Sequence, residues 1–245
     1  MKKNKLIVLF LLCLLVFTCV ACSKETNRET EPFTNSSEEQ EETDIDQPEE
    51  TPGSIDEGAV TGSDAWKALT FTLDGNTISL PADYSAFENT GWSIDPEETD
   101  TSEQLETGSG TLRVWLYNDS YSTEDVSMNI QFFNLDEETK QLLDSEVHVF
   151  DLRIEPGASS YPDLELPEGI TWGATVDEIY EAYGNEAAFE DSEDTLMVDE
   201  YDTYFRLTYR GESTDLIFPS MDLYVDKEFG LYKITLSYSV GFLYE

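Results

Sequence analysis

Residues 126–132 read Val-Ser-Met-Asn-Ile-Gln-Phe, and an apolar residue occupies every second position of this stretch. Successive side chains of a β-strand point to opposite faces, so the alternation predicts a strand with one buried and one solvated face. Such strands are typical of antiparallel sheets, which commonly pack one face on the core and leave the other wet. The stretch therefore favours a fold built from antiparallel strands.

Other segments between residues 66 and 245 repeat this alternation. The apolar rows that we expect to form strands are Leu112–Val114–Leu116, His148–Phe150–Leu152–Ile154, Phe205–Leu207–Tyr209, Met221–Leu223–Val225 and Tyr232–Ile234–Leu236–Tyr238–Val240. Asp74-Gly75-Asn76 is a turn sequence between two short apolar segments, 69–73 and 77–80, and it predicts a hairpin.

The clearest helix signal covers residues 176–183. Thr175 and Glu178 have the spacing of a capping box, and Gly184 is placed to end the helix in a left-handed conformation. The apolar positions Val176, Ile179, Tyr180 and Tyr183 follow the spacing of one helix face. We expect this face to pack on the row Tyr232, Ile234, Leu236 and Tyr238.

A shorter helix is expected over residues 82–89, with Tyr84 and Phe87 inward and Gly91 closing it. Strands outnumber helices and come in adjacent runs, which favours an α+β fold of antiparallel β-sheets with a few short helices. Two organisations stay open, a single domain or two small α+β modules. In the second case the N-terminal module spans 64–160 and the C-terminal module spans 161–245.

The start of the chain has the features of an export signal. Three lysines within the first five residues precede an almost unbroken apolar run over 6–17, so residues 1–21 are expected to be a signal peptide. An uncleaved anchor is the alternative, but the run is short of the about 20 apolar residues that a spanning helix needs.

The signal ends in Val20-Ala21-Cys22, which resembles the lipobox of bacterial lipoproteins. In that pattern a cysteine after a small residue is lipidated and becomes the new N-terminus, although Leu is preferred where this chain has Cys19. A plain signal peptide cut nearby is the alternative. We expect Cys22 to carry the lipid, palmitate included, and to hold the protein on the extracytoplasmic face of the cell membrane.

Cleavage there would leave Cys22 as the last of the three cysteines in the chain. The exported domain would then have no disulfide and no free thiol. Thiol catalysis and cysteine metal sites are thereby excluded.

Residues 22–63 are rich in Glu, Asp, Thr and Ser and are expected to be a disordered acidic tether, because they have too little apolar surface to offset chain entropy. The whole chain has 53 acidic and 13 basic residues and a formal net charge of −40. This balance excludes nucleic-acid binding through clustered basic residues. It would attract a cationic partner, peptide or metal ion, but acidic surfaces are common on exported proteins and need no ligand, which is the stronger explanation.

Two segments resemble modules of uncharacterised lipoproteins of Gram-positive gut bacteria. They are residues 73–81, Leu-Asp-Gly-Asn-Thr-Ile-Ser-Leu-Pro, with Gly91-Trp92, and Leu166-Pro167 with Gly169-Ile170-Thr171-Trp172-Gly173-Ala174-Thr175 and Tyr183-Gly184. The capped helix that ends in Tyr-Gly before antiparallel strands is also similar to the β-lactamase-inhibitor-protein and SmpA/OmlA type of small lipoprotein module. The first family implies no activity, and the second implies contact with another protein.

Candidate catalytic groups are few. His148 is the only histidine, so a Ser-His-Asp triad would have to use it, but its place in an apolar row favours a packed or edge histidine. Paired carboxylates could in principle hydrolyse a sugar, yet pairs arise by chance among so many acidic residues. We therefore expect no catalytic residue and no cofactor.

An acidic stretch over residues 190–202 offers weak calcium candidates, Asp191, Asp194, Asp199 and Asp202, with Glu193 and Glu200 beside them. Calcium prefers several carboxylates on a flexible backbone, but the spacing and glycine of an EF-hand are missing. A solvated acidic loop is the more ordinary explanation, so we expect no metal site.

Five aromatic residues occupy the polar positions of the alternation, namely Trp115, Tyr117, Phe133, Tyr204 and Tyr224. On a wet face they would form a platform for a peptide or a sugar. Large exposed apolar patches are unusual on monomers, which favours the core for most of them.

Together these features favour a membrane-tethered extracytoplasmic lipoprotein that is not an enzyme and that binds or supports another envelope or extracellular protein. Two alternatives stay open, a hydrolase of envelope polymers and a lipoprotein that binds a sugar or peptide ligand.

Overall fold

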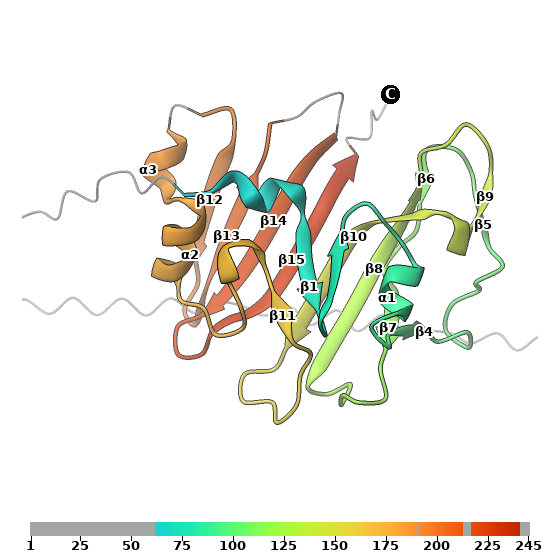
Figure 1. The fold of residues 1–245 in the computed structure, drawn as a ribbon, viewed down its shortest axis with the longest axis horizontal. Coiled ribbons are helices and arrows are strands. Elements are labelled where there is room, and N and C mark those ends of the chain that lie inside the picture. Colours follow the sequence, from blue (N-terminus) through green and yellow to red (C-terminus); the bar gives the residue numbers. More distant parts are fainter. Residues whose placement is uncertain (1–61, 191, 213–216, 241–245) are drawn as a thin grey trace, which may run out of the picture. The chain divides into compact units, whose positions relative to one another are not determined.

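The computed structural model describes residues 62–190, 192–212 and 217–240, which form a mostly antiparallel β-structure with a few short helices (Figure 1). These residues belong to one compact unit, Ser54–Glu245. The expected signal peptide 1–21, Cys22 and the tether up to residue 61 lie outside the described residues. Within the described ranges, no helix combines the length and hydropathy of a membrane span.

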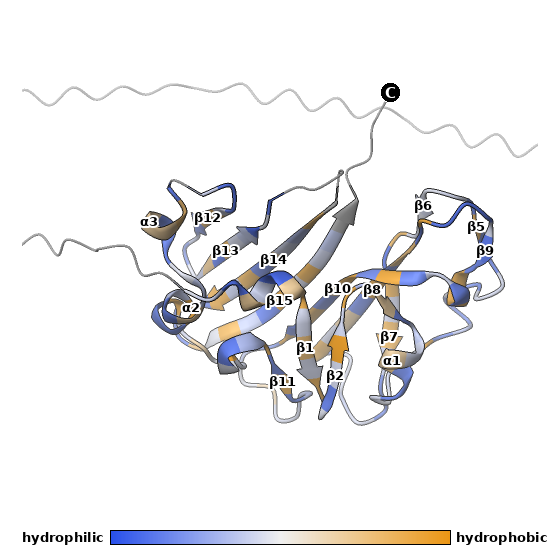
Figure 2. Cartoon of the chain, turned by 45° about the horizontal axis from the view of Figure 1, so that its top comes forward, coloured by the Kyte–Doolittle hydropathy of each residue, from blue (hydrophilic) through white to orange (hydrophobic). Residues whose placement is uncertain are grey.

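The largest element is a ten-stranded sheet in which the strands follow the order β12-β13-β14-β15-β10-β8-β7-β4, while β3 pairs with β10 and β6 pairs with β8. Its strands are β3 (Ala82–Asp83), β4 (Ser93–Ile94), β6 (Ser109–Gly110), β7 (Val114–Tyr117), β8 (Val126–Asn134), β10 (Glu146–Ile154), β12 (Thr195–Glu200), β13 (Tyr204–Arg210), β14 (Ile217–Asp226) and β15 (Gly230–Val240). Hydrophilic and hydrophobic bands alternate along its long strands (Figure 2), as a sheet with one buried face requires.

A second layer covers one face of this sheet (Figure 1). It contains a three-stranded sheet of β1 (Thr70–Leu73), β2 (Asn76–Ser79) and β11 (Leu164–Glu165), with the helices η1 (Asp64–Ala68), α1 (Ser85–Glu88), η3 (Pro167–Gly169), α2 (Val176–Tyr183) and α3 (Glu186–Phe189). The ring of Phe71 on β1 stacks on Phe150 of β10 with centroids 4.5 Å apart, and Trp66 of η1 lies 5.7 Å from Tyr209 of β13. The two layers thereby share one buried core.

The remaining elements form a small extension beyond β8. They are the two-stranded sheet of β5 (Gln104–Leu105) and β9 (Lys140–Gln141), followed by η2 (Leu142–Asp144). Leu105 and Leu142 are buried and join the extension to the core.

Strands from both expected modules pair with each other. β10 pairs with β15 from Val149–Ser237 to Arg153–Lys233, and β1 pairs with β11. Residues 64–160 and 161–245 therefore build one sheet and one core instead of two separate modules. Because the helices are few and short, the α+β label applies only loosely to this β-rich fold.

The predicted capped helix is confirmed as α2. The backbone N–H of Thr175 donates to Glu178 Oε2 at 2.8 Å, and the Glu178 N–H donates back to Thr175 Oγ1 at 3.3 Å. Gly184 ends the helix with φ 95° and ψ 151°, which lies outside the left-handed helical region. The expected left-handed cap is therefore wrong, although this backbone conformation also needs glycine.

The predicted helix over 82–89 is shorter in the structure. Ala82 and Asp83 form β3 instead, because they pair with Val147 and Glu146 of β10. Only Ser85–Glu88 is helical, while Tyr84 and Phe87 are buried as expected.

Two β-bulges interrupt the expected apolar rows. In β10 the register shifts between Val147 and Val149, so that His148 is an extra residue outside the row of Phe150. In β15 the shift leaves Tyr232 as the extra residue, and its ring lies beside those of Tyr204 and Tyr224. A bulge inserts one residue into a strand and so reverses which face the following side chains take.

This change of face alters the expected partners of α2. Ile179 and Tyr183 are buried, and the Tyr183 ring makes an edge contact with Tyr209 of β13. Ile234 and Leu236 are buried on the core face, but Tyr232 is not part of their row. The predicted packing against a row that includes Tyr232 is therefore wrong.

Two predicted boundaries also differ from the structure, namely the start of the strand expected at Leu112 and the start of the folded domain. Leu112 precedes β7 and is 89% exposed, so it does not share the buried row of Val114 and Leu116. At the N-terminal end, Ser63 caps η1, and its backbone N–H donates to Ala182 O at 2.8 Å. The folded domain thus begins before the predicted boundary at residue 64.

Candidate functional site

The outer face of the large sheet, opposite the core, carries a polar network across five strands. The register places Trp115, Asn129, Asp151, Thr235 and Asp222 side by side in one row. The neighbouring row contains Arg153, Lys233, Tyr224 and Arg206. We call these two rows the outer face.

Ion pairs and hydrogen bonds join these side chains. Asp151 accepts hydrogen bonds from Asn129 Nδ2 at 3.1 Å and Thr235 Oγ1 at 2.8 Å, and it pairs with Lys233 Nζ at 3.1 Å. Arg206 Nη2 pairs with Asp222 Oδ2 at 2.8 Å. The charges on this face therefore compensate one another locally.

A tyrosine cluster adjoins the network and consists of Tyr201, Tyr204, Tyr224 and Tyr232. The Tyr201 and Tyr204 rings stack with centroids 4.5 Å apart, and Tyr204 lies 6.0 Å from Tyr224. Lys233 Nζ lies 4.8 Å from the centre of the Tyr224 ring, a cation–π contact that links the cluster to the network.

The structure brings together two of the five predicted platform residues. Tyr204 and Tyr224 share the tyrosine cluster and are partly exposed, so placing them in the core is wrong. Trp115 is 41% exposed and lies on β7, four strands from Tyr224. Tyr117 donates a hydrogen bond to Glu98 at 2.5 Å, which raises its pKa to about 12, and Phe133 lies beside His148.

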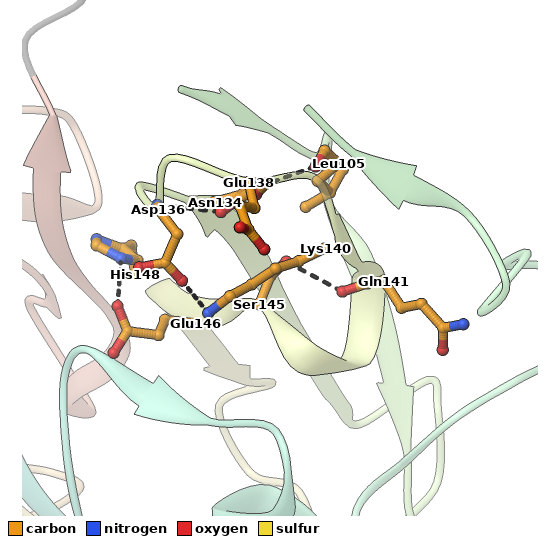
Figure 3. A network of polar contacts seen from close by, with 9 residues as sticks. All are labelled: Leu105, Asn134, Asp136, Glu138, Lys140, Gln141, Ser145, Glu146 and His148. Carbon is orange, nitrogen blue, oxygen red and sulfur yellow. Dashed lines mark hydrogen bonds and ion pairs between the residues drawn. The ribbon is translucent and has the colours of Figure 1, made fainter. Parts of the chain in front are cut away.

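His148 lies in a closed environment at the β10 bulge (Figure 3). It is 1% exposed, its Nδ1 lies 3.3 Å from Tyr238 O, and its ring is 5.4 Å from Phe133. Burial lowers the pKa of the imidazole, although the Tyr238 carbonyl and Glu146 oppose that shift. A buried neutral histidine of this kind has no route to a substrate.

The acidic stretch is distributed over several elements. Asp194 pairs with Lys67 at 2.5 Å and accepts a hydrogen bond from the Glu212 N–H, while Asp199 lies in β12. Asp202 is exposed in the turn before β13, and Asp191 lies outside the described residues. In the described ranges no three acidic, histidine or cysteine side chains gather as metal ligands would.

A hollowed surface lies elsewhere, around residues 161–177. It consists of three depressions of about 490, 510 and 310 Å³. The first two share Thr171 and Trp172, and the last two share Gly173. We call this surface the Trp172 groove.

Aromatic and acidic side chains line the Trp172 groove. Tyr161 is 44% and Phe229 is 54% exposed, while Trp172 is half-buried and donates from Nε1 to Pro162 O at 2.8 Å. The acidic lining residues are Asp163, Glu165, Glu168, Asp177, Glu178, Glu181, Asp226 and Glu228. Lys227 is the one basic residue among the described lining, and it is paired with Glu200 at 2.6 Å.

Comparison with known proteins found no matching family model, no matching curated protein and no matching solved structure. The resemblances to lipoprotein modules therefore stay predictions.

The sequence reasoning did not foresee the Trp172 groove. The Gly-Ile-Thr-Trp-Gly segment at 169–173 lines it, and this segment has neither strand nor helix periodicity. Tyr161 lines the depression of about 490 Å³ and Phe229 that of about 310 Å³, and no periodic pattern in the sequence connects the two residues.

Proposed function

We propose that the protein is a lipid-anchored extracytoplasmic lipoprotein that binds another envelope or extracellular protein and catalyses no reaction. The observation that carries this proposal is the Trp172 groove, where exposed aromatic side chains stand among carboxylates. Aromatic residues are enriched at protein interfaces and dominate their binding energy.

The charge of the groove selects the kind of protein segment that fits. Its carboxylates favour lysine and arginine side chains, and its aromatic rings favour apolar groups or cation–π contacts between them. The formal net charge of −40 also steers cationic segments toward the molecule. The partner therefore presents a basic segment with aromatic or aliphatic residues.

The anchoring part of the proposal depends on Cys22. The basic start, the apolar run and the Val-Ala-Cys ending support lipidation at this residue. Radiolabelled palmitate should enter the wild-type protein in its host and should be lost from Cys22→Ala. Cys13→Ala is the matched control and should label normally, whereas equal labelling of Cys22→Ala would disprove the anchor.

The non-enzymatic part is supported by the environment of His148. This side chain is buried between Phe133 and Tyr238 and cannot activate a nucleophile in the groove. A hydrolase of envelope polymers is the competing function, and it would use carboxylates. Turnover of cell-wall polymers by the purified chain, lost in Glu168→Gln or Glu181→Gln, would establish the hydrolase instead.

Site-specific crosslinking tests the binding function directly. A photoreactive phenylalanine analogue in place of Tyr161, in the full chain on intact cells, should crosslink to one protein at a basic segment. The same analogue in place of Leu143, which is 40% exposed outside the groove, is the control. Glu168→Gln with Glu181→Gln should weaken the adduct, and equal adducts from both analogue positions would contradict a specific site.

A further inference from the structure

We propose that the outer face of the large sheet is a second binding site, and that it takes a neutral saccharide on the tyrosine cluster and the Arg206–Asp222 pair. This site is separate from the Trp172 groove, because none of its side chains lines the three depressions of that groove. It therefore adds a ligand to the protein partner proposed above.

Unpartnered polar atoms on this face give the first line of support. Asn129 Oδ1, Asp222 Oδ1 and Arg206 Nε are buried and have no hydrogen-bond partner among the described residues. Asn129 is only 1% exposed as a residue, and a buried polar atom without a partner costs about 1–3 kcal/mol. Such atoms are uncommon in folded proteins, and two of these three belong to the Arg206–Asp222 pair, so this pair keeps one donor and one acceptor for hydroxyl groups of a ligand.

The chemistry of the three atoms selects the ligand class. Two of them are acceptors and one is a donor, so the complementary group must both donate and accept. A hydroxyl group does both, and a saccharide presents several hydroxyls in fixed positions. A phosphate could accept from Arg206 and donate through its own hydroxyl, but its negative charge would lie beside the carboxylates of Asp222 and Asp151. A metal cation would leave the Arg206 donor unpaired.

The local charge balance favours a neutral ligand. Lys233 is paired with Asp151, and Arg206 is paired with Asp222, so neither charge is available to a counter-ion. An anionic ligand would meet the two carboxylates, and a cationic ligand would meet the two basic groups. Like-charge contacts of that kind oppose binding, whereas hydroxyls can bond to either sign.

The tyrosine rings provide the apolar surface that a saccharide also needs. Tyr201 is 44% exposed in the turn between β12 and β13, and its ring stacks on that of Tyr204. Trp115 is 41% exposed in the neighbouring row, which also contains Asn129 and Asp151. With strands about 4.8 Å apart, the four steps from Trp115 to Tyr224 span about 19 Å, which suits an oligosaccharide more than a single sugar.

Access to the buried atoms requires a local change. The three atoms have no exposed surface, so a ligand reaches them when long side chains of the same face turn aside. Arg206 and Lys233 have exposed side-chain fractions of 32% and 21%. Rotamer changes of such side chains are common when ligands bind.

Binding of defined oligosaccharides to the purified full chain tests this proposal. The probes are neutral tetrasaccharides of glucose, mannose and N-acetylglucosamine, with tetragalacturonate and inorganic phosphate as anionic comparisons, measured by calorimetry. At least one neutral probe should bind in preference to the anionic ones. Tyr201→Ala and Tyr224→Ala should each lower its affinity by about tenfold or more, the loss typical of an aromatic binding residue.

Tyr161→Ala is the matched control, because Tyr161 has the same 44% exposure as Tyr201 but lies in the Trp172 groove. It should bind the saccharide normally, whereas Tyr201→Ala should weaken saccharide binding and leave the protein adduct of the analogue at position 161 unchanged. The proposal is overturned if no neutral probe binds, if an anionic probe binds better, or if Tyr201→Ala and Tyr161→Ala have equal effects. A protein captured on the outer face in place of a saccharide would also overturn it.

Discussion

His148 is held inside the fold as a neutral group. Its Nδ1 lies 3.3 Å from Tyr238 O, and its Nε2 lies 3.6 Å from Glu146 Oε2. The Phe133 and Tyr238 rings pack around the imidazole, and the Asp136–Lys140 pair lies nearby (Figure 3). Burial makes the charged form unfavourable and lowers the pKa of His148.

This lowered pKa makes stability depend on pH. The unfolded chain binds a proton at His148 near pH 6.5, whereas the folded chain resists it to lower pH. The free energy of unfolding should therefore fall as pH drops below about 6.5. Urea unfolding of the wild type and His148→Gln over this range measures the effect, since the variant should lack that part of the slope while keeping the contribution of the carboxylates.

A comparison of single residues explains why part of the site could not be predicted from the sequence. Alternation correctly predicts that Leu207, Leu223 and Ile234 are buried, because it follows from strand geometry. His148 and Tyr232 leave their rows at bulges, and a bulge depends on the partner strand, which the sequence of one strand does not contain. The place of Tyr232 in the tyrosine cluster was therefore not predictable.

At the scale of one element, α2 depends on its cap and on one buried stripe. Ile179 is fully buried, so Ile179→Ala should lower the free energy of unfolding by about 2–5 kcal/mol. Thr175→Ala removes the capping box and should cost about 1 kcal/mol. Denaturant unfolding measures both, with Glu181→Ala on the exposed side as the control. A loss below about 0.5 kcal/mol for Ile179→Ala, as for a surface substitution, would contradict the burial.

Elements with local signals are the ones that the sequence predicts well. The bounds of α2 follow from Thr175, Glu178 and Gly184 within a short stretch, and the β1–β2 turn follows from Asp74-Gly75, which both have positive φ. The first two residues of the expected 82–89 helix form β3 instead, because their backbone pairs with Glu146 and Val147 of β10. Tertiary pairing of this kind overrides local propensity and is absent from any local pattern.

At the scale of the whole molecule, the sheet is assembled from strands far apart in sequence. β10 pairs with β15, and β1 pairs with β11, so each predicted half supplies strands that the other half needs. Tyr204 and Tyr224 meet because β13 and β14 are neighbours, whereas Trp115 is four strands away. Strand order decides which predicted platform residues form one site, and alternation alone carries no information about strand order.

This assembly predicts cooperative unfolding. Separating residues 64–160 from 161–245 would expose the β10 and β15 edges and the apolar faces of Phe150 and Leu236. Small domains with one core unfold in a single step, so the full chain should show one transition in urea by both tryptophan fluorescence and circular dichroism. Each half expressed alone should lack a cooperative transition, and mixing the two should restore it in part. Two separate transitions of the full chain, or independent folding of either half, would show that the halves are domains after all.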